Sequence, residues 1–76
     1  LKLRIAPLEA LADAVRPGQG AIVTNAGLIN AGKVANDSSD GIDWQDHSGT
    51  VINEATGTMT GARHGITTDN DVTVTN

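Results

Sequence analysis

Four polar or aromatic side chains stand close together near the middle of the chain and offer the chemistry of a binding site. They are Asp43, Trp44, Asp46 and His47. Carboxylates accept hydrogen bonds from hydroxyl groups, an imidazole binds a proton or a metal, and an indole presents a flat apolar face to a sugar ring. Trp44 has a second interpretation, because the only aromatic residue of the chain could instead cover a hydrophobic core.

Two metal sites can be drawn from the same region. Residues 37–43 space oxygen ligands along a loop that contains a glycine, as calcium loops do. However, this glycine stands at the fifth position of the loop, and Ser48 rather than a bidentate Glu stands at the twelfth. His47 and His64 would share a metal only if stacked segments brought them together, which their spacing does not require. We expect no metal and no cofactor, with calcium as the alternative.

The spacing of the remaining reactive side chains gives little support to catalysis. No serine lies in a G-x-S-x-G motif, and Asp46, His47 and Ser48 are consecutive. Neighbouring residues of a strand point to opposite faces, so these three do not form a triad. Paired carboxylates drawn from Asp43, Asp46 and Glu54 would have to meet across stacked strands to act as a glycosidase does. We expect a protein that is not an enzyme and keep a polysaccharide-active enzyme as an alternative.

Composition and charge exclude several other classes. The 76 residues carry a net charge of −4, contain one Trp, and lack Cys, Phe and Tyr. Without cysteine there is no disulfide framework, so a chain this small must gain stability from repetition or from neighbours. An acidic chain without interleaved aromatic residues argues against binding to nucleic acid or to anionic membrane surfaces. No apolar run is long enough to span a membrane.

The first residues predict a strand followed by a helix. Residues 1–5 alternate apolar and charged side chains, which is the period of a half-buried strand. Pro7 suits the first turn of a helix. Apolar residues then recur at the i, i+3, i+4, i+7 spacing of an amphipathic helix, at Leu8, Leu11, Ala12 and Val15. Pro17 and Gly18 end this pattern, so we predict a helix over residues 7–16.

From Gly20 onward the chain repeats itself. Val23-Thr24-Asn25 returns as Val51-Ile52-Asn53 and as Val74-Thr75-Asn76, and Gly41-Ile42 returns as Gly65-Ile66. Residues 33–40 are then an insertion in the first copy. A period in the twenties predicts short strands that stack in parallel on their own copies, ~4.8 Å apart. Asn25, Asn53 and Asn76 fall at one corner of the repeat and predict a structural column of amides, with ligand binding as the alternative.

These repeats resemble those of bacterial autotransporter passenger domains. The resemblance covers residues 21–76 and rests on the order V-x-N, G-x-M, G and G-I in residues 51–61 and 65–66, followed by residues 72–76. It implies a right-handed parallel β-helix that is exported and displayed at the cell surface. Members of that family include adhesins, proteases, esterases and cytotoxins, but this chain matches none of their catalytic motifs. Their C-terminal membrane barrel has no counterpart in these residues, so self-export is not implied.

We therefore predict an all-β fold, a short parallel β-solenoid (β-helix) with an N-terminal strand and a capping helix. Residues 1–19 would form the cap, and residues 20–76 would form the rungs, each rung being one copy of the repeat. A small β-sandwich or meander with one helix is the alternative. The last copy of the repeat has only begun at Val72. We therefore expect the free strand edge at the C-terminal end of the stack to pair with further rungs or with a stacked subunit.

The function expected from this architecture is that of a structural or adhesive module in a secreted bacterial surface protein. Its partner would be a carbohydrate or a host surface receptor, without nucleic acid and without membrane insertion by this segment. Two alternatives stay open, a self-assembling filament subunit and the polysaccharide-active enzyme.

Overall fold

The computed structural model describes residues 2–5, 8–9, 12–32 and 38–76, and it confirms the predicted all-β class in them. This part of the chain contains no helix. Its short strands are β1 (Lys2–Ile5), β2 (Leu8–Glu9), β3 (Ile22–Asn25), β4 (Leu28–Ala31), β5 (Asp40–Asp43), β6 (Gly49–Asn53), β7 (Thr58–Gly61), β8 (His64–Thr67) and β9 (Val72–Thr75). Strands of this length cannot bury an apolar face alone, so their stability depends on pairing with neighbours.

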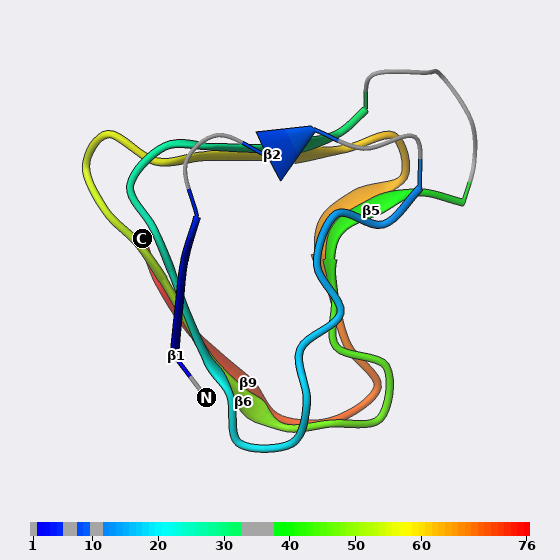
Figure 1. Cartoon of the computed structure of the whole chain (residues 1–76). Helices are drawn as coiled ribbons and strands as arrows, with labels where there is room; N and C mark the ends of the chain where they lie inside the picture. Colours follow the sequence, from blue (N-terminus) through cyan, green and yellow to red (C-terminus); the bar gives the residue numbers. More distant parts are fainter. Residues whose placement is uncertain (1, 6–7, 10–11, 33–37) are drawn as a thin grey trace.

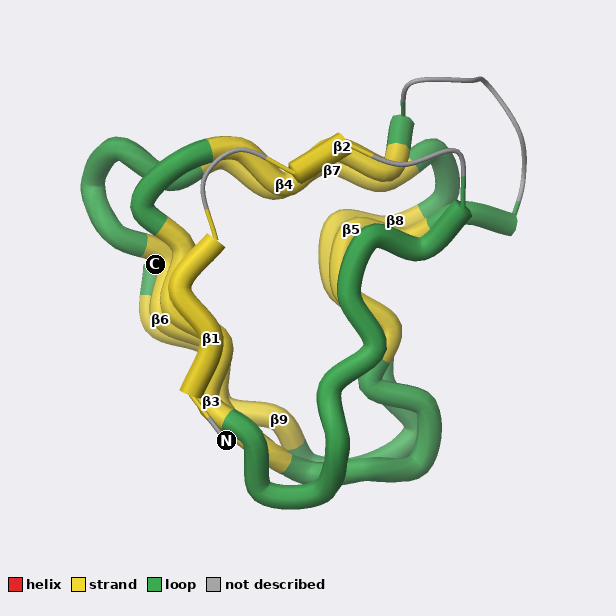
Figure 2. The backbone as a smooth tube through the Cα atoms, viewed as in Figure 1, coloured by secondary structure: helices red, strands yellow, loops and turns green. Residues whose placement is uncertain are grey.

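The strands form three parallel sheets. The first sheet has the order β1-β3-β6-β9, the second β2-β4-β7 and the third β5-β8. The chain visits the three sheets in turn, and they form the sides of a triangle when viewed along the stack (Figure 1, Figure 2). Seen from the β1 end, the path runs clockwise as it recedes and is therefore right-handed (Figure 1). We call one pass along the three sheets a rung, and the β9 end the lower end.

Equivalent residues of successive rungs lie side by side in these sheets. Val23 pairs with Val51 and Val51 with Val74 in the first sheet. Ile29 pairs with Met59 in the second sheet, and Ile42 with Ile66 in the third. Val23, Val51, Ile29 and Ile42 are fully buried, so the apolar positions of the repeat form columns that face the interior.

The helix predicted over residues 7–16 is wrong in the described part of that range. Leu8 and Glu9 form β2, which pairs with β4, and Val15 makes an isolated parallel bridge with Ile42. Residues 7, 10 and 11 lie outside the described residues. An isolated helix of ten residues is marginal, whereas the edges of β4 and β5 supply backbone partners that an extended chain can use.

Three further predictions concern the strand at residues 1–5, the insertion at residues 33–40 and the boundary after residue 19. The strand predicted over residues 1–5 is confirmed as β1, with Leu1 outside the described residues. Of the predicted insertion, residues 33–37 also lie outside them, whereas Asp40 opens β5 and pairs with His64. The boundary between residues 1–19 and 20–76 stays a prediction.

Trp44 closes the core inside the triangle. It is fully buried beside the other core side chains, which are Val15, Ala21, Val23, Ile29, Ile42 and Val51. Gly49, the first residue of β6, faces the Trp44 ring. A Cβ atom at Gly49 would overlap ring carbons Cη2 and Cζ3 and would come within 2.5 Å of the Ala21 carbonyl oxygen. The close approach of ring and backbone therefore requires glycine at this position.

We expect Gly49→Ala to lower the free energy of unfolding by about 1–3 kcal/mol, because an added methyl group must displace an enclosed ring or a backbone carbonyl. Denaturant unfolding followed by Trp44 fluorescence measures this change. Gly18→Ala is the matched control, since no described residue other than its two chain neighbours comes within 4 Å of a Cβ atom placed there. Equal unfolding midpoints for the two variants would contradict the prediction.

Candidate functional site

A column of asparagine side chains occupies the corner between the first and second sheets. Asn25 Nδ2 donates to Asn53 Oδ1 at 3.1 Å, and Asn53 Nδ2 donates to Asn76 Oδ1 at 2.8 Å. Asn25 Nδ2 also lies 3.2 Å from the Gly27 carbonyl oxygen and 3.1 Å from that of Thr58. The Gly27 amide donates back to Asn25 Oδ1 at 3.2 Å. Because Asn25 is fully buried and both of its polar atoms have partners within the chain, this arrangement is structural.

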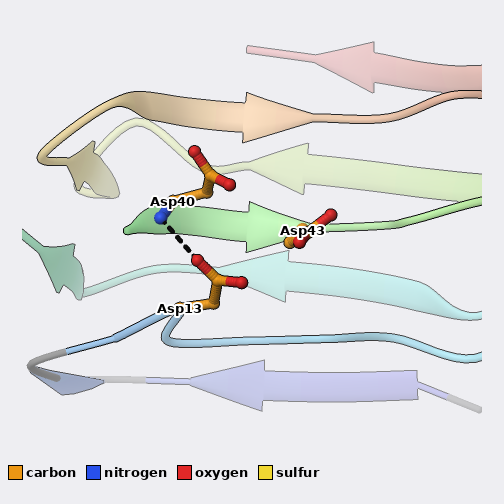
Figure 3. A group of neighbouring side chains, drawn as sticks. All are labelled: Asp13, Asp40 and Asp43. Atoms are coloured by element: carbon orange, nitrogen blue, oxygen red, sulfur yellow. Dashed lines mark hydrogen bonds between the residues drawn. The ribbon is translucent and has the colours of Figure 1, made fainter. Parts of the chain in front are cut away.

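Three carboxylates gather beside the third sheet, and we call them the Asp cluster. Asp13, Asp40 and Asp43 place carboxylate oxygens within 4.8 Å of one another. Asp40 and Asp43 begin and end β5, while Asp13 lies on the preceding rung, drawn beneath β5 in Figure 3, where it accepts a hydrogen bond of 2.7 Å from the Asp40 amide. The side chains of Asp40 and Asp13 are 0% and 5% exposed. Burying such charges is costly unless they are paired.

Basic side chains supply that pairing. Arg63 Nη2 lies 2.7 Å from Asp40 Oδ2, and Arg63 Nε donates to Asp40 Oδ1 at 3.1 Å. His64 Nδ1 lies 3.0 Å from the same Oδ1. Arg16 contacts Asp13 Oδ2 through Nη2 at 2.9 Å and through Nε at 3.1 Å. Both oxygens of Asp13 and of Asp40 are thus engaged within the chain, and the contacts tie three successive rungs together.

These contacts leave little in the Asp cluster for a cation. A divalent ion would have to compete with Arg16 for Asp13 and with Arg63 for Asp40. In addition, Asp43 Oδ1 accepts a hydrogen bond of 2.9 Å from the Gln45 amide. The calcium site considered over residues 37–43 would use Asp40 and Asp43, and residue 37 lies outside the described residues. Calcium binding therefore stays an alternative, although the described carboxylate oxygens are not arranged around a common point as calcium ligands.

Hydrogen bonding sets the ionisation of the two most enclosed carboxyl groups. The Arg63 guanidinium holds the pKa of Asp40 below its ordinary value of 3.8 in spite of burial, and His64 acts in the same direction. Burial would raise the pKa of Asp13, but the hydrogen bonds from the Asp40 amide and from Arg16 lower it overall. Both groups are therefore ionised at neutral pH and favour the folded state there.

We expect stability to decline as the pH falls below about 4. A carboxyl group with a lowered pKa in the folded state contributes fully above its unfolded value of 3.8, and the contribution is lost as the pH falls through the folded value. Asp40→Asn should flatten this acid limb and cost about 1–3 kcal/mol at pH 7, limited by the 44% exposure of Arg63. Urea unfolding midpoints measured from acid to neutral pH test both statements.

Asp46→Asn is the matched control for this titration, because the Asp46 side chain is 88% exposed. It should leave the midpoint at pH 7 unchanged. An acid limb that is as steep in Asp40→Asn as in the parent chain would show that Asp40 is not a source of the pH dependence.

The four residues predicted to bind a ligand do not form one site. Trp44 lies in the core with 0% exposure, whereas Asp46 projects into solvent. His47 Nδ1 lies 3.2 Å from the Pro17 carbonyl oxygen, and Asp43 is half-buried in the Asp cluster. Trp44 as a stacking surface for sugars is therefore wrong, because neighbouring side chains enclose its ring, and its interpretation as a core residue holds.

The two histidines considered for metal binding lie apart, and so do Asp43 and Glu54, which were considered for catalysis. His64 opens β8 against Asp40, while His47 follows the far end of β5. Asp43 ends β5 in the third sheet, whereas Glu54 follows β6 at the corner that leads to the second sheet. The topology therefore places the members of each pair at different ends or corners of the triangle.

A polar groove of about 320 Å³ lies beside the end of the third sheet. It is lined by Asp43, Gln45, Arg63, Thr67, Thr68 and Asp69. Gln45 has a φ of 57°, and its carbonyl oxygen accepts a hydrogen bond of 2.8 Å from the Asp69 amide. The sequence prediction included only Asp43 of these residues. The repeat could have predicted the groove, because Asp43 pairs with Thr67 and the polar turns that follow these two residues are stacked on each other.

Comparisons of this chain with protein-family models, with curated proteins and with solved structures return no match. Among the residues that the structure describes, no helix is long and apolar enough to cross a membrane. The likeness to autotransporter passenger domains therefore rests on the repeat pattern of the sequence alone.

Proposed function

We propose that this chain is part of a parallel β-solenoid that serves as a structural or adhesive module of a secreted bacterial surface protein. The observation that carries the proposal is the direct stacking of equivalent residues, such as Val23, Val51 and Val74. Each strand pairs with strands of adjacent rungs, so a protein of this kind lengthens by adding rungs and acts as a stiff spacer. The repeat pattern shared with autotransporter passenger domains supports display at the cell surface.

Surface display can be tested on cells that produce the protein from its own gene. An antibody against the exposed turn at residues 69–71 should label intact cells, and external protease should remove the signal. An antibody against a cytoplasmic protein serves as the control for intactness. Labelling that appears only after the cells are permeabilised would contradict display at the surface.

An adhesive role would use the polar groove. Its carboxylates and threonine hydroxyls accept hydrogen bonds, and its guanidinium and amide groups donate them, which complements the hydroxyl groups of a carbohydrate. Binding to a polysaccharide array should fall at least fivefold in Asp69→Ala and stay unchanged in Asp71→Ala, an exposed acidic residue that does not line the groove. Equal binding by the two variants would exclude the groove as the site.

A self-assembling filament subunit is the second candidate, and the parallel stacking of short strands along one axis favours it. Filaments with a 4.8 Å axial repeat in fibre diffraction are expected if subunits stack along the rung axis. A single monomeric species over a wide concentration range, measured by sedimentation, would exclude this alternative.

A further inference from the structure

The third sheet contains the one Asp-Gly pair of the sequence, Asp40-Gly41 at the start of β5. A glycine that follows an aspartate has an amide nitrogen that is free to attack the side-chain carboxyl carbon, because no Cβ atom shields it and its backbone turns easily. The six other aspartates are each followed by a residue with a side chain. Asp40-Gly41 is therefore the place where this chain is chemically most prone to rearrange its own backbone.

Packing requires glycine at position 41. A Cβ atom there would come within 2.5 Å of the Gly65 carbonyl oxygen and 3.3 Å of the Thr60 carbonyl oxygen, and both oxygens belong to the backbone of paired strands. The φ of Gly41 is not positive, so the requirement comes from this close approach and not from the backbone conformation. The fold therefore keeps the reactive pair, and any protection of it must act on Asp40.

The rearrangement begins when the Gly41 nitrogen attacks Cγ of a protonated Asp40 carboxyl group. A C–N bond forms, the bond from Cγ to the hydroxyl oxygen breaks, and the hydroxyl group leaves with the amide proton as water. The product is a five-membered succinimide. Water then opens this ring either at Cγ, which restores aspartate, or at the main-chain carbonyl of residue 40, which leaves the chain running through the former side chain as isoaspartate. The reaction needs only water as co-reactant.

Two basic side chains hold the Asp40 carboxyl group against this attack, and we call them the Asp40 clamp. Arg63 contacts Oδ2 through Nη2 at 2.7 Å and Oδ1 through Nε at 3.1 Å, and His64 Nδ1 lies 3.0 Å from Oδ1. These contacts favour the ionised carboxylate, which has no hydroxyl group to lose, although the carboxylates of Asp13 and Asp43 lie nearby. The Asp40 carboxylate also points away from β5, on the side opposite to Asp13 (Figure 3), so closing the ring would pull it off the clamp.

The backbone on both sides of the Asp40-Gly41 bond is held by the preceding rung. The Asp40 amide donates to Asp13 Oδ1 at 2.7 Å, and the Asp40 carbonyl oxygen accepts a hydrogen bond of 3.2 Å from the Ala14 amide. The Gly41 carbonyl oxygen accepts another of 3.1 Å from the Val15 amide. Because ring closure turns this peptide unit out of the extended conformation, the reaction requires a local opening that breaks these hydrogen bonds.

We propose that Asp40-Gly41 is a latent site of spontaneous isoaspartate formation and that the Asp40 clamp governs its rate. The rate follows the population of a form in which the carboxyl group has left Arg63 and His64. Isoaspartate adds one main-chain carbon between residues 40 and 41. Because Asp40 pairs with His64 and Ile42 with Ile66, the longer main chain does not keep both pairings, and a modified chain loses part of the third sheet. This inference goes beyond the proposed function and does not depend on it.

Incubation of the 76-residue chain at neutral pH tests the site itself. Isoaspartate is quantified at each aspartate by peptide mapping and by labelling with an isoaspartyl methyltransferase, in native buffer and in guanidinium chloride. In denaturant, Asp40 should be the aspartate that reacts fastest, and folding should slow its reaction by about tenfold or more, because only the opened form reacts. Equal rates at Asp40 in the two solutions, or a faster reaction at another aspartate in denaturant, overturns the proposal.

Arg63→Gln separates the effect of the clamp from that of global stability. Gly49→Ala is the matched control, since it weakens the fold at the Trp44 ring and leaves the Asp40 contacts in place. At denaturant concentrations that give the two variants the same free energy of unfolding, Asp40 should react about tenfold faster or more in Arg63→Gln. His64→Ala, which removes one contact of the clamp, should show a smaller increase and replaces Arg63→Gln if that variant does not fold. Rates at Asp40 that are equal in the clamp variant and in Gly49→Ala overturn the proposal.

Discussion

Replacing Trp44 with alanine is expected to lower the free energy of unfolding by about 3–5 kcal/mol, a large part of the stability that a small domain possesses. Trp44 is the bulkiest of the fully buried side chains in the described residues. Alanine would leave a cavity beside the Ala21 backbone and Gly49, and backbone tied into parallel sheets cannot collapse to fill it. Denaturant unfolding followed by far-ultraviolet circular dichroism measures the loss, since the fluorescent residue is removed.

Trp44→Phe is the matched control for this variant. Phenylalanine keeps most of the ring and removes an indole N–H that is buried without a hydrogen-bond partner, so its cost should be about 1 kcal/mol or less. In the Trp44→Ala background, Gly49→Ala should cost less than in the parent chain, because the overlap with the ring is removed while the approach of 2.5 Å to the Ala21 carbonyl oxygen remains. A loss below about 1 kcal/mol in Trp44→Ala would contradict the role of the ring in the core.

The repeat in the sequence predicted the stacking of the chain because parallel pairing places like residues together. Gly41-Ile42 and Gly65-Ile66 are 24 residues apart, and Ile42 pairs with Ile66 in the third sheet. The recurring Asn25, Asn53 and Asn76 similarly form one continuous column of amides. Periodicity carried this information without any knowledge of side-chain contacts.

The N-terminal segment shows why a local pattern can mislead. Leu8 and Val15 are seven residues apart, which is two turns of a helix, but Met59 and Ile66 are also seven residues apart. In the folded chain each pair spans the second and third sheets, since Leu8 pairs with Ile29 and Val15 with Ile42. A spacing of seven residues is therefore compatible with a helix and with two strands in adjacent sheets. Which of the two forms depends on whether partner strands are available.

The sequence predicted Asp40 and Asp43 as neighbours in one loop, but it missed Asp13 and the arginines that pair with the Asp cluster, for a different reason. Asp13, Asp40 and Arg63 occupy equivalent corners of three rungs, but their charges and residue types differ, so no repeat in the sequence marks them. Their contacts depend on how successive rungs are aligned, and this alignment is set only when the strands pair in the sheets. The place of Trp44 stayed open between two interpretations for a similar reason, because its neighbours Asp43 and Gln45 are polar and do not indicate a core position.

Asn25 lies at the corner between the first and second sheets, and its replacement with alanine is expected to lower the free energy of unfolding by about 3–5 kcal/mol. Alanine would leave the carbonyl oxygens of Gly27 and Thr58, the Gly27 amide and Asn53 Oδ1 without their partner. A polar group that loses a hydrogen-bond partner costs about 1–3 kcal/mol where water does not replace it, and Asn25 itself is fully buried. Urea unfolding followed by Trp44 fluorescence measures the change.

The column supplies its own graded controls, since burial decreases down the stack from Asn25 to Asn53 to Asn76. Asn76→Ala should cost less than about 0.5 kcal/mol, because water can replace an exposed amide, and Asn53→Ala should fall between the two. Asn25→Asp tests the donor directly, since a carboxylate of the same shape cannot donate to the three acceptors that Asn25 Nδ2 now serves. Equal effects at Asn25 and Asn76 would mean that the amides do not act as a buried structural column, whereas a gradient that follows burial assigns their stabilising effect to the hydrogen bonds along the stack.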